Sequence, residues 1–339
     1  MKLKLLHVAS GKANAHVWSE PFRRALAELG TLQIVEDADS LAEDEIVALL
    51  RRADVVLGSW GSARVPEALA DSPGKVRYLC CVTGGVRHFV SLRHIDAGIP
   101  VTNWGDTPAH EVAEGAVCLL LAALKDLHAQ IMSVRNGGGG AVDNVSYGGS
   151  LRGLNVGIYG FGVIGRRFAQ MLQPFGCVIR VFDPYVAEMP SNVIRVETLE
   201  ELFSQSEAVA IHAGLTEQTR GSVTRELLAL LPRHGLIVNT ARGDIIDQPA
   251  LFDELRSGRL RAALDVLAEP ESLPPDHEAR QWENLILTCH YITRGWPTDG
   301  LPPTRLLTMH EVCIDNLKRF RNNQPLRFLM DRRRFELST

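Results

Sequence analysis

The chain has 339 residues, of which 45% are hydrophobic and 22% charged, and its formal net charge is −4. This length favours two hydrophobic cores, and therefore two domains, over a single one. The composition excludes disordered, collagen-like and disulfide-scaffold proteins. The small negative charge provides no general attraction for nucleic acid or for an anionic membrane.

The sequence contains no segment that is typical of a membrane span or a secretory signal. Its longest apolar run, residues 117–124, is too short to cross a bilayer, and Ser10 and Lys12 interrupt the N-terminus before an apolar region develops. Six cysteines lie at positions 80, 81, 118, 177, 289 and 313, without a Cys-x-x-Cys pair. This usage favours a reducing, cytoplasmic compartment, and no metal site is expected.

The first hundred residues alternate short apolar runs with helical patterns. The patterns predict strands at residues 3–8, 32–35, 53–58, 76–82 and 101–103, and helices at 18–29 and 41–52. A longer helix is expected at 111–134. The glycine-rich residues that follow predict a flexible connection over 136–150.

A second alternation fills the rest of the chain. Strands are predicted at 154–160, 178–183, 208–212, 235–240, 262–266 and 285–288, and helices at 164–175, 199–204, 225–231 and 250–257. A last helix, 306–321, could pack back on the first domain. The arginines beyond it are expected in a solvated tail or a subunit contact: Arg327, Arg332, Arg333 and Arg334. The two alternations predict an α/β protein with two doubly wound, parallel-sheet lobes.

The strongest motif is Gly160-Phe161-Gly162-Val163-Ile164-Gly165, between a predicted strand and a predicted helix. Gly160 permits a tight turn, and Gly162 lets the backbone approach a pyrophosphate. Gly165 lets the helix and the strand pack closely. The N–H groups at the helix N-terminus attract phosphate. The motif therefore predicts a dinucleotide site.

An acidic residue closes the next strand, as this type of site requires. Asp183 would accept hydrogen bonds from the adenosine ribose hydroxyls and would repel a 2′-phosphate. The following residues, Pro184-Tyr185, supply no compensating cation. These features favour NAD over NADP.

Charged residues follow three of the later strands. Arg242 comes after the strand at 235–240, where a guanidinium can hold a carboxylate through two hydrogen bonds. His290 follows the last strand and can exchange a proton near neutral pH. Glu269 and Glu271 follow the strand at 262–266, and either could pair with His290. The partner is the carboxylate that reaches a ring nitrogen at about 3 Å.

From about residue 53 to 321 the chain resembles the D-isomer-specific 2-hydroxyacid dehydrogenases, a family that includes glycerate, glyoxylate/hydroxypyruvate and phosphoglycerate dehydrogenases. The resemblance rests on blocks in one order, at residues 98–103, 112–114, 151–153, 157–166, 182–185, 212–221, 239–243, 263–266 and 288–290. It implies a discontinuous, flavodoxin-like substrate domain, residues 1–103 plus 299–339, and a Rossmann-type NAD domain, residues 104–298. It also implies a cleft that holds the reaction and a homodimer.

The resemblance also assigns roles by position. Arg242 would hold the substrate carboxylate and C2 oxygen, His290 would act as acid and base, and a glutamate would hold His290 protonated. Gly84 and Gly85 would bind the substrate carboxylate through backbone N–H groups. The residues expected to bind the cofactor are Gly160, Gly162, Val163, Ile164, Gly165, Asp183, His212, Ala213, Gly214, Thr219, Thr240, Ala241, Asp265 and His290.

The chain departs from the family pattern around these positions. Cys289 replaces a proline, and residues 83–87 replace the more usual Gly-Val-Gly-x-Asp. Arg87 or Arg294 near the cleft would favour a substrate with an additional anionic group. The resemblance implies an enzyme that interconverts a D-2-hydroxy acid and its 2-keto acid. An alternative is a non-catalytic, NAD-sensing protein similar to the corepressors built on the same fold.

Overall fold

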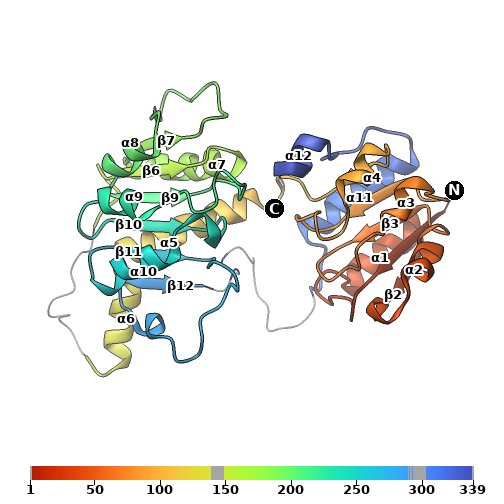
Figure 1. The fold of residues 1–339 in the computed structure, drawn as a ribbon, viewed down its shortest axis with the longest axis horizontal. Coiled ribbons are helices and arrows are strands. Elements are labelled where there is room, and N and C mark those ends of the chain that lie inside the picture. The colour runs from red at the N-terminus through yellow and green to blue at the C-terminus, as the bar shows by residue number, and fades with distance from the viewer. Residues whose placement is uncertain (1, 139–148, 289, 291, 293–302, 338–339) are drawn as a thin grey trace. The chain divides into compact units, whose positions relative to one another are not determined.

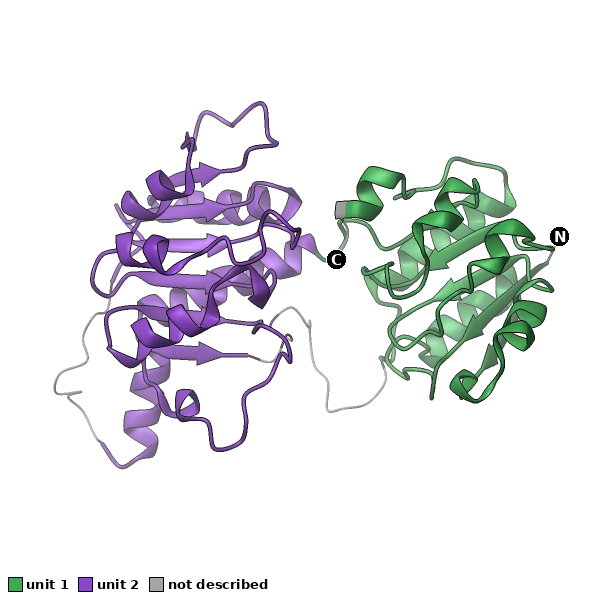
Figure 2. Cartoon of the chain, viewed as in Figure 1, with its two compact units in different colours: residues 1–108, 296–339 green, residues 109–295 purple. Residues whose placement is uncertain are grey.

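The computed structural model describes residues 2–138, 149–288, 290, 292 and 303–337. The chain forms two compact units (Figure 2). Unit 1 combines Met1–Pro108 with Trp296–Thr339, and unit 2 comprises Ala109–Gly295.

Unit 1 is built on a five-stranded, all-parallel sheet of order β2-β1-β3-β4-β5. Its strands are β1 (Leu3–Val8), β2 (Gly30–Val35), β3 (Val55–Gly58), β4 (Tyr78–Cys81) and β5 (Val101–Thr102). Its helices are α1 (Glu20–Leu29), α2 (Glu43–Leu50), α3 (Ala68–Asp71), α4 (Leu92–Asp96), α11 (Thr308–Arg321) and α12 (Arg332–Leu337). This strand order is that of the flavodoxin-like doubly wound fold.

Alternation along the strands of unit 1 builds one core on each face of its sheet. Leu3 and Leu5 of β1 pack with residues of α1 and α11, whereas Leu6 and Val8 pack on the side of α2, α3 and α12. Successive side chains of a strand point to opposite faces, so both faces need a helical cover. The prediction that the last long helix packs back on the first domain is confirmed by α11.

Unit 2 contains a seven-stranded parallel sheet of order β12-β11-β10-β9-β6-β7-β8 (Figure 1). Its strands are β6 (Asn155–Tyr159), β7 (Val178–Phe182), β8 (Ile194–Arg195), β9 (Ala208–Ile211), β10 (Leu236–Asn239), β11 (Arg261–Leu264) and β12 (Leu285–Leu287). Its helices are α5 (Ala109–Leu124), α6 (Leu127–Arg135), α7 (Val163–Leu172), α8 (Leu199–Ser204), α9 (Arg225–Leu230) and α10 (Gln248–Arg256). Two all-parallel sheets with helices on both faces confirm the predicted fold class.

The winding of the unit 2 sheet reverses beside β6. The chain moves outward from β6 to β7 and β8, then returns to place β9 on the other side of β6. In open α/β sheets ligands bind at the carboxyl ends of the strands at such a switch point. The glycine motif begins at this point, directly after β6.

The prediction of one long helix at 111–134 is wrong, because this part of the chain forms two helices, α5 and α6. Between α5 and α6, Asp126 adopts a left-handed conformation, with φ of 51°, and the two helix axes differ by 61°. Arg261 of β11 donates to the carbonyl of Ala123 (3.0 Å) and to Oδ1 of Asp126 (2.9 Å). A tertiary contact at the end of α5 therefore accompanies the break. In the described part of the chain, no single helix is long and apolar enough to cross a membrane.

The C-terminal arginines are exposed, as expected, but the segment that carries them is folded and is not a tail. The N–H of Met330 donates to the carbonyl of Val101 (2.8 Å), and Arg332 of α12 pairs with Asp96 of α4 (2.7 Å). The segment is thus an integral part of unit 1. Of the flexible connection expected at 136–150, residues 139–148 lie outside the described residues.

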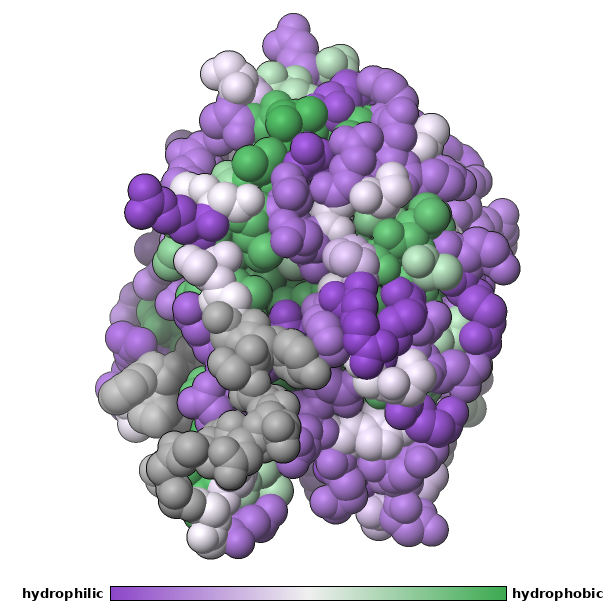
Figure 3. Space-filling view, turned by 90° about the vertical axis from the view of Figure 1, so that its left-hand side faces the viewer, coloured by the Kyte–Doolittle hydropathy of each residue, from purple (hydrophilic) through white to green (hydrophobic). Residues whose placement is uncertain are grey.

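The face shown in Figure 3 is mostly hydrophilic, with hydrophobic residues gathered in limited patches. Large hydrophobic side chains that stay exposed belong mainly to unit 2, among them Ile131 and Val134 on α6. Scattered exposed apolar residues are ordinary on protein surfaces.

Candidate active site

The predicted site residues of unit 2 follow the carboxyl ends of neighbouring parallel strands. Gly160 comes after β6, Arg242 after β10, Asp265 after β11 and His290 after β12. Because these strands are parallel and paired in register, their carboxyl ends lie along one edge of the sheet. The fold therefore brings the glycine motif and the charged residues to the same edge.

Two of the three glycines of the motif have a steric reason within the protein. Gly160 has φ of +93°, and a Cβ there would lie 2.4 Å from the backbone nitrogen of Ala213. A Cβ on Gly165 would lie 2.2 Å from the carbonyl oxygen of Gly160. A Cβ on Gly162 would meet none of the described residues within 4 Å. Protein packing thus accounts for Gly160 and Gly165, whereas Gly162 borders open space.

That open space lies at the N-terminus of α7. Gly162 is the N-cap of this helix, and no side chain caps it. The first helical residues, Val163 and Ile164, therefore offer N–H groups that the helix cannot satisfy, together with the positive end of the helix dipole. This is the arrangement that holds a phosphate.

Asp183, directly after β7, joins the glycine turn to the neighbouring strand. Its Oδ2 accepts from the N–H of Phe161 at 2.7 Å, and its Oδ1 accepts from the N–H of Tyr185 at 2.8 Å. A carboxylate oxygen has room for more than one donor. The side chain can therefore hold the turn and still accept hydrogen bonds from ribose hydroxyls.

The loop after β9 begins at His212, whose N–H donates to the carbonyl of Tyr159 at 2.7 Å. Its ring packs 4.8 Å from that of Phe168, and burial lowers the pKa of His212 to about 3. The ring is therefore neutral near pH 7, and among the described residues neither ring nitrogen has a hydrogen-bond partner. Farther along, the Thr219 hydroxyl accepts from the N–H of Thr216 and donates to the carbonyl of Gly214, both at 2.7 Å.

Asn239, at the end of β10, shapes the loop that carries Arg242. Its side-chain nitrogen donates to the carbonyl of Arg242 (2.9 Å), and its side-chain oxygen accepts from the N–H of Ala241 (3.0 Å). Sequence reasoning gave Asn239 no role, although a fully buried Asn at a strand end is a recognisable signal for such a turn. Thr240 lies between Asn239 and Ala241 in the sequence, and its buried hydroxyl has no hydrogen-bond partner among the described side chains and backbone groups.

Arg242 is half-buried, with Nη1 donating to the carbonyl of Ala241 at 2.7 Å. Burial lowers the pKa of Arg242, and the negative charge of Glu271 opposes that shift. A half-buried guanidinium can bind an anionic ligand through charge-assisted hydrogen bonds.

The carboxylate that reaches His290 is that of Glu271. Its Oε2 lies 3.0 Å from Nδ1 of His290. The Glu269 carboxylate makes no such contact with His290 within the described chain. The backbone N–H of His290 donates to the carbonyl of Asp265 at 2.8 Å, and the residue has φ of 60°. The histidine is thus held at both its backbone and its ring.

Asp265 is buried beneath this histidine segment. Its Oδ1 accepts from the Thr288 hydroxyl at 2.5 Å and from the N–H of Ile292 at 3.3 Å. One side chain therefore fixes the chain on both sides of His290.

The predicted substrate residues Gly84 and Gly85 lie in unit 1, in the loop that follows β4. The Gly84 carbonyl accepts from the side-chain nitrogen of Asn103 at 2.6 Å, and a Cβ on Gly84 would lie 2.4 Å from the Trp104 ring. The Arg87 guanidinium donates to backbone carbonyls of α12. Arg294 lies outside the described residues.

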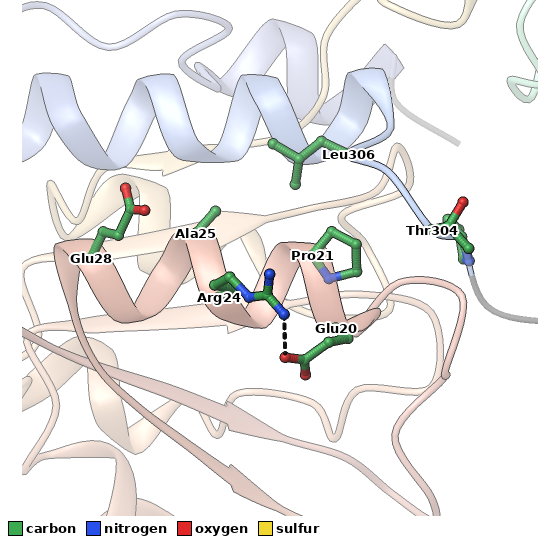
Figure 4. Close-up of a pocket in the computed structure, with 8 residues that line it drawn as sticks. Glu20, Pro21, Arg24, Ala25, Glu28, Thr304 and Leu306 are labelled. Carbon is green, nitrogen blue, oxygen red and sulfur yellow. Dashed lines mark hydrogen bonds and ion pairs between the residues drawn. The ribbon is translucent and has the colours of Figure 1, made fainter.

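A shallow depression elsewhere in unit 1 contains none of the predicted site residues. It lies between α1 and the segment that leads into α11, and its acidic lining residues are Glu20 and Glu28 (Figure 4). Arg24 pairs with Glu20 there at 3.4 Å. The described residues that line this depression provide no predicted catalytic group.

The residues of unit 2 fit a dinucleotide. Among the described residues, no atom within 4 Å of a Cβ at Gly162 obstructs the approach of a phosphate to the α7 N-terminus, and Asp183 can accept from a ribose. The buried Thr240 hydroxyl and the ring nitrogens of His212 are orphaned polar groups that a polar ligand can satisfy.

Comparison with known proteins agrees with this geometry. The family described as "D-isomer specific 2-hydroxyacid dehydrogenase, NAD binding domain" matches residues 117–291. The chain is 31% identical over 258 residues to the hydroxypyruvate reductase of Thermotoga maritima, covering 75% of this chain and 82% of that protein. It is 30% identical over 272 residues to the D-3-phosphoglycerate dehydrogenase of Methanocaldococcus jannaschii, covering 79% of this chain and 50% of that protein.

The fold is likewise similar to that of solved structures. The 2-hydroxyacid dehydrogenase of Ketogulonicigenium vulgare matches with a TM-score of 0.78 at 22% identity, over 98% of this chain and 99% of that one. The chain belongs to the D-isomer specific 2-hydroxyacid dehydrogenase family, and its unit 2 carries the NAD-binding domain. It spans about half the length of the phosphoglycerate dehydrogenase that it matches.

Proposed function

We propose that the protein is an NAD-dependent oxidoreductase that interconverts a D-2-hydroxy acid and its 2-keto acid. The observation that carries the proposal is the contact between Glu271 and His290, 3.0 Å apart, at the carboxyl edge of the sheet that also carries the half-buried Arg242. Family membership supports the same reaction. The name of the Thermotoga relative makes hydroxypyruvate a suitable first substrate to test.

Each charged residue has a proposed task. Arg242 holds the substrate carboxylate and stabilises negative charge on the C2 oxygen. His290 donates a proton to that oxygen in reduction and accepts it from the hydroxyl in oxidation. Glu271 accepts from Nδ1 of His290, which leaves Nε2 for the substrate and stabilises the charged ring. When bound, the nicotinamide cofactor supplies or accepts the hydride at C2.

The remaining predicted residues complete the proposed site. Backbone N–H groups of Gly84 and Gly85 bind the substrate carboxylate. The glycine turn and the α7 N-terminus bind the pyrophosphate, Asp183 binds the ribose, and Thr240 and Asp265 border the nicotinamide. We also infer a homodimer from family resemblance, which sedimentation of the purified protein tests directly.

The test is oxidation of NADH with glyoxylate, hydroxypyruvate, pyruvate and bulkier 2-keto acids. We expect turnover with at least one of them, and we expect His290→Ala to reduce kcat by about a hundredfold or more. NADH affinity should stay near that of the wild type in this variant. His128→Ala, a half-buried histidine on α6, is the matched control. Tight NADH binding without turnover on any keto acid would instead favour the NAD-sensing alternative.

A further inference from the structure

The side chain of Arg87 is bound to the last turn of α12. Its Nε donates to the carbonyl of Phe335 at 3.2 Å, and Nη2 donates to the carbonyl of Glu336. The guanidinium also lies 5.9 Å from the centre of the Phe335 ring. The last carbonyls of a helix have no partner within the helix and carry the negative end of its dipole. Arg87 therefore caps α12.

Independent contacts fix α12 to the sheet of unit 1. The backbone of Met330, just before α12, is hydrogen-bonded to Val101 of β5 at 2.8 Å. Arg332 pairs with Asp96 of α4 at 2.7 Å. Phe335 packs against the core that contains Met330. These contacts hold α12 in place, so that a segment bonded to α12 through Arg87 is attached to the body of unit 1.

Arg87 belongs to the loop that carries Gly84 and Gly85. The inner side of this loop is fixed because Val86 and Phe89 are buried in the same core. Arg87 and His88 are both exposed, and each ties the outer side of the loop to another element: Arg87 donates to α12 carbonyls, and Nε2 of His88 lies 3.0 Å from the carbonyl oxygen of Ser59. Only Val86 separates Arg87 from Gly85. The carbonyls of Gly84 and Gly85 accept from Asn103 (2.6 Å) and from the Cys81 thiol (3.4 Å), which leaves the N–H groups of the two glycines as the part of the backbone that we expect a change in the Arg87 contact to displace.

We propose that Arg87 is a positioning residue and that α12, through it, holds the Gly84–Gly85 loop in the conformation that binds the substrate carboxylate. This inference rests on the proposed function. The arginine acts on the substrate through the loop, because its Nε and Nη2 are engaged by α12 carbonyls, which turns the guanidinium toward that helix. It therefore lowers the KM of every 2-keto acid that the protein uses, whatever other groups the acid carries.

The experiment compares Arg87→Ala and Arg87→Lys with the wild type, using a keto acid that has one carboxylate and another that has a second anionic group. We expect Arg87→Ala to raise KM about fivefold for both, corresponding to the loss of roughly 1 kcal/mol of hydrogen bonding, with kcat changed by less than about twofold. Arg87→Lys retains the charge and restores part of the effect. Arg334→Ala, which removes a bond to Leu329 within the same segment, should leave KM unchanged.

A double-mutant cycle tests the contact itself. Phe335→Ala and Arg87→Ala should raise KM by less in combination than the product of their separate effects, because both loosen the same attachment. A loss confined to the substrate with the second anionic group would assign Arg87 to direct substrate contact and overturn the inference. Unchanged KM in Arg87→Ala would overturn it as well.

Hydrogen exchange separates this inference from the proposed function. Backbone amides of residues 83–90 should exchange faster in Arg87→Ala than in the wild type or in Arg334→Ala, whether or not any substrate is turned over. Faster exchange in a protein that reduces no keto acid would refute the proposed function and leave the α12 contact standing. Unaltered exchange in an active protein would refute the positioning role alone.

Discussion

Glu271 and His290 are separated by 19 residues along the chain, and their side chains meet with Oε2 3.0 Å from Nδ1. The loop after β11 delivers the carboxylate, and the segment after β12 delivers the imidazole. These are neighbouring strands, so the contact follows from the sheet order. The contact also orients the imidazole. Because Nδ1 faces Glu271, Nε2 is the ring nitrogen available to a substrate.

The first prediction distinguishes the two glutamates. Glu271→Gln should lower kcat by about tenfold or more, because the amide removes the negative charge that stabilises a protonated His290. Glu269→Gln is the matched control and should change kcat by less than about twofold. Steady-state kinetics of NADH oxidation measures both. A larger loss in Glu269→Gln would reassign the pair.

The second prediction separates folding from cofactor binding within one motif. Gly165→Ala places a methyl group 2.2 Å from the Gly160 carbonyl oxygen, so we expect a loss of at least about 2 kcal/mol in the free energy of unfolding. Gly162→Ala meets no protein atom within 4 Å and should leave stability within about 1 kcal/mol. It should nevertheless weaken NADH binding, because the methyl group occupies the pyrophosphate space. Denaturant unfolding and NADH titration give the two readouts, and equal NADH affinity in Gly162→Ala would contradict the assignment.

The third prediction concerns the break between α5 and α6. Arg261 and Asp126 form a buried pair, with side chains 9% and 8% exposed. Arg261→Ala leaves the Asp126 carboxylate without this partner, and we expect a destabilisation of about 3 kcal/mol. The exposed pair of Arg24 and Glu20 in Figure 4 supplies the control, because Arg24→Ala should cost less than about 1 kcal/mol. Comparable losses in the two variants would show that the buried pair is not what stabilises this corner.

The fourth prediction is that acid destabilises the fold through buried neutral histidines. Burial lowers the pKa of His7 to about 4 from an ordinary value of 6.5. Between these values the unfolded chain binds a proton that the folded chain does not, so the free energy of unfolding falls as pH drops from 6.5 to 4 and this contribution levels off below 4. The contribution of His7 is about 3 kcal/mol over that range.

His7→Phe tests this assignment. In denaturant titrations at a series of pH values, the unfolding free energy of the variant should depend less steeply on pH. The decrease in slope should correspond to up to about one fewer proton taken up on unfolding. His310, whose pKa burial also lowers to about 4, should preserve part of the slope. An unchanged slope would exclude His7 as a contributor.

The sequence patterns predicted most strands because buried parallel strands are short apolar runs bounded by glycine or polar residues. They failed where a tertiary contact decides the outcome. The apolar pattern continues through the end of α5, and only the placement of Arg261 of β11, distant in sequence, accompanies the turn at Asp126. The patterns did not predict helix α12 for a similar reason. Its arginine-rich sequence is typical of a solvated tail, and the residues that it contacts are distant in the sequence.

For the candidate site, motifs and resemblance supplied the residue types and the edge of the sheet where they gather. They could not choose between Glu269 and Glu271, because the loop that carries them is irregular and one inserted residue changes the count. They also could not show that Arg87 turns toward α12, because its acceptors are backbone carbonyls, which no side-chain pattern encodes.

Unit 1 is assembled from two stretches of chain separated by the whole of unit 2. Phe22 and Leu26 of α1 share their core with Cys313 and Leu317 of α11. During synthesis, we therefore expect one face of the N-terminal sheet to be covered by α1 but not by α11 until the ribosome has added nearly two hundred further residues. Unit 2 is continuous in sequence and can complete its core earlier. We therefore expect unit 2 to fold on the nascent chain before unit 1 does.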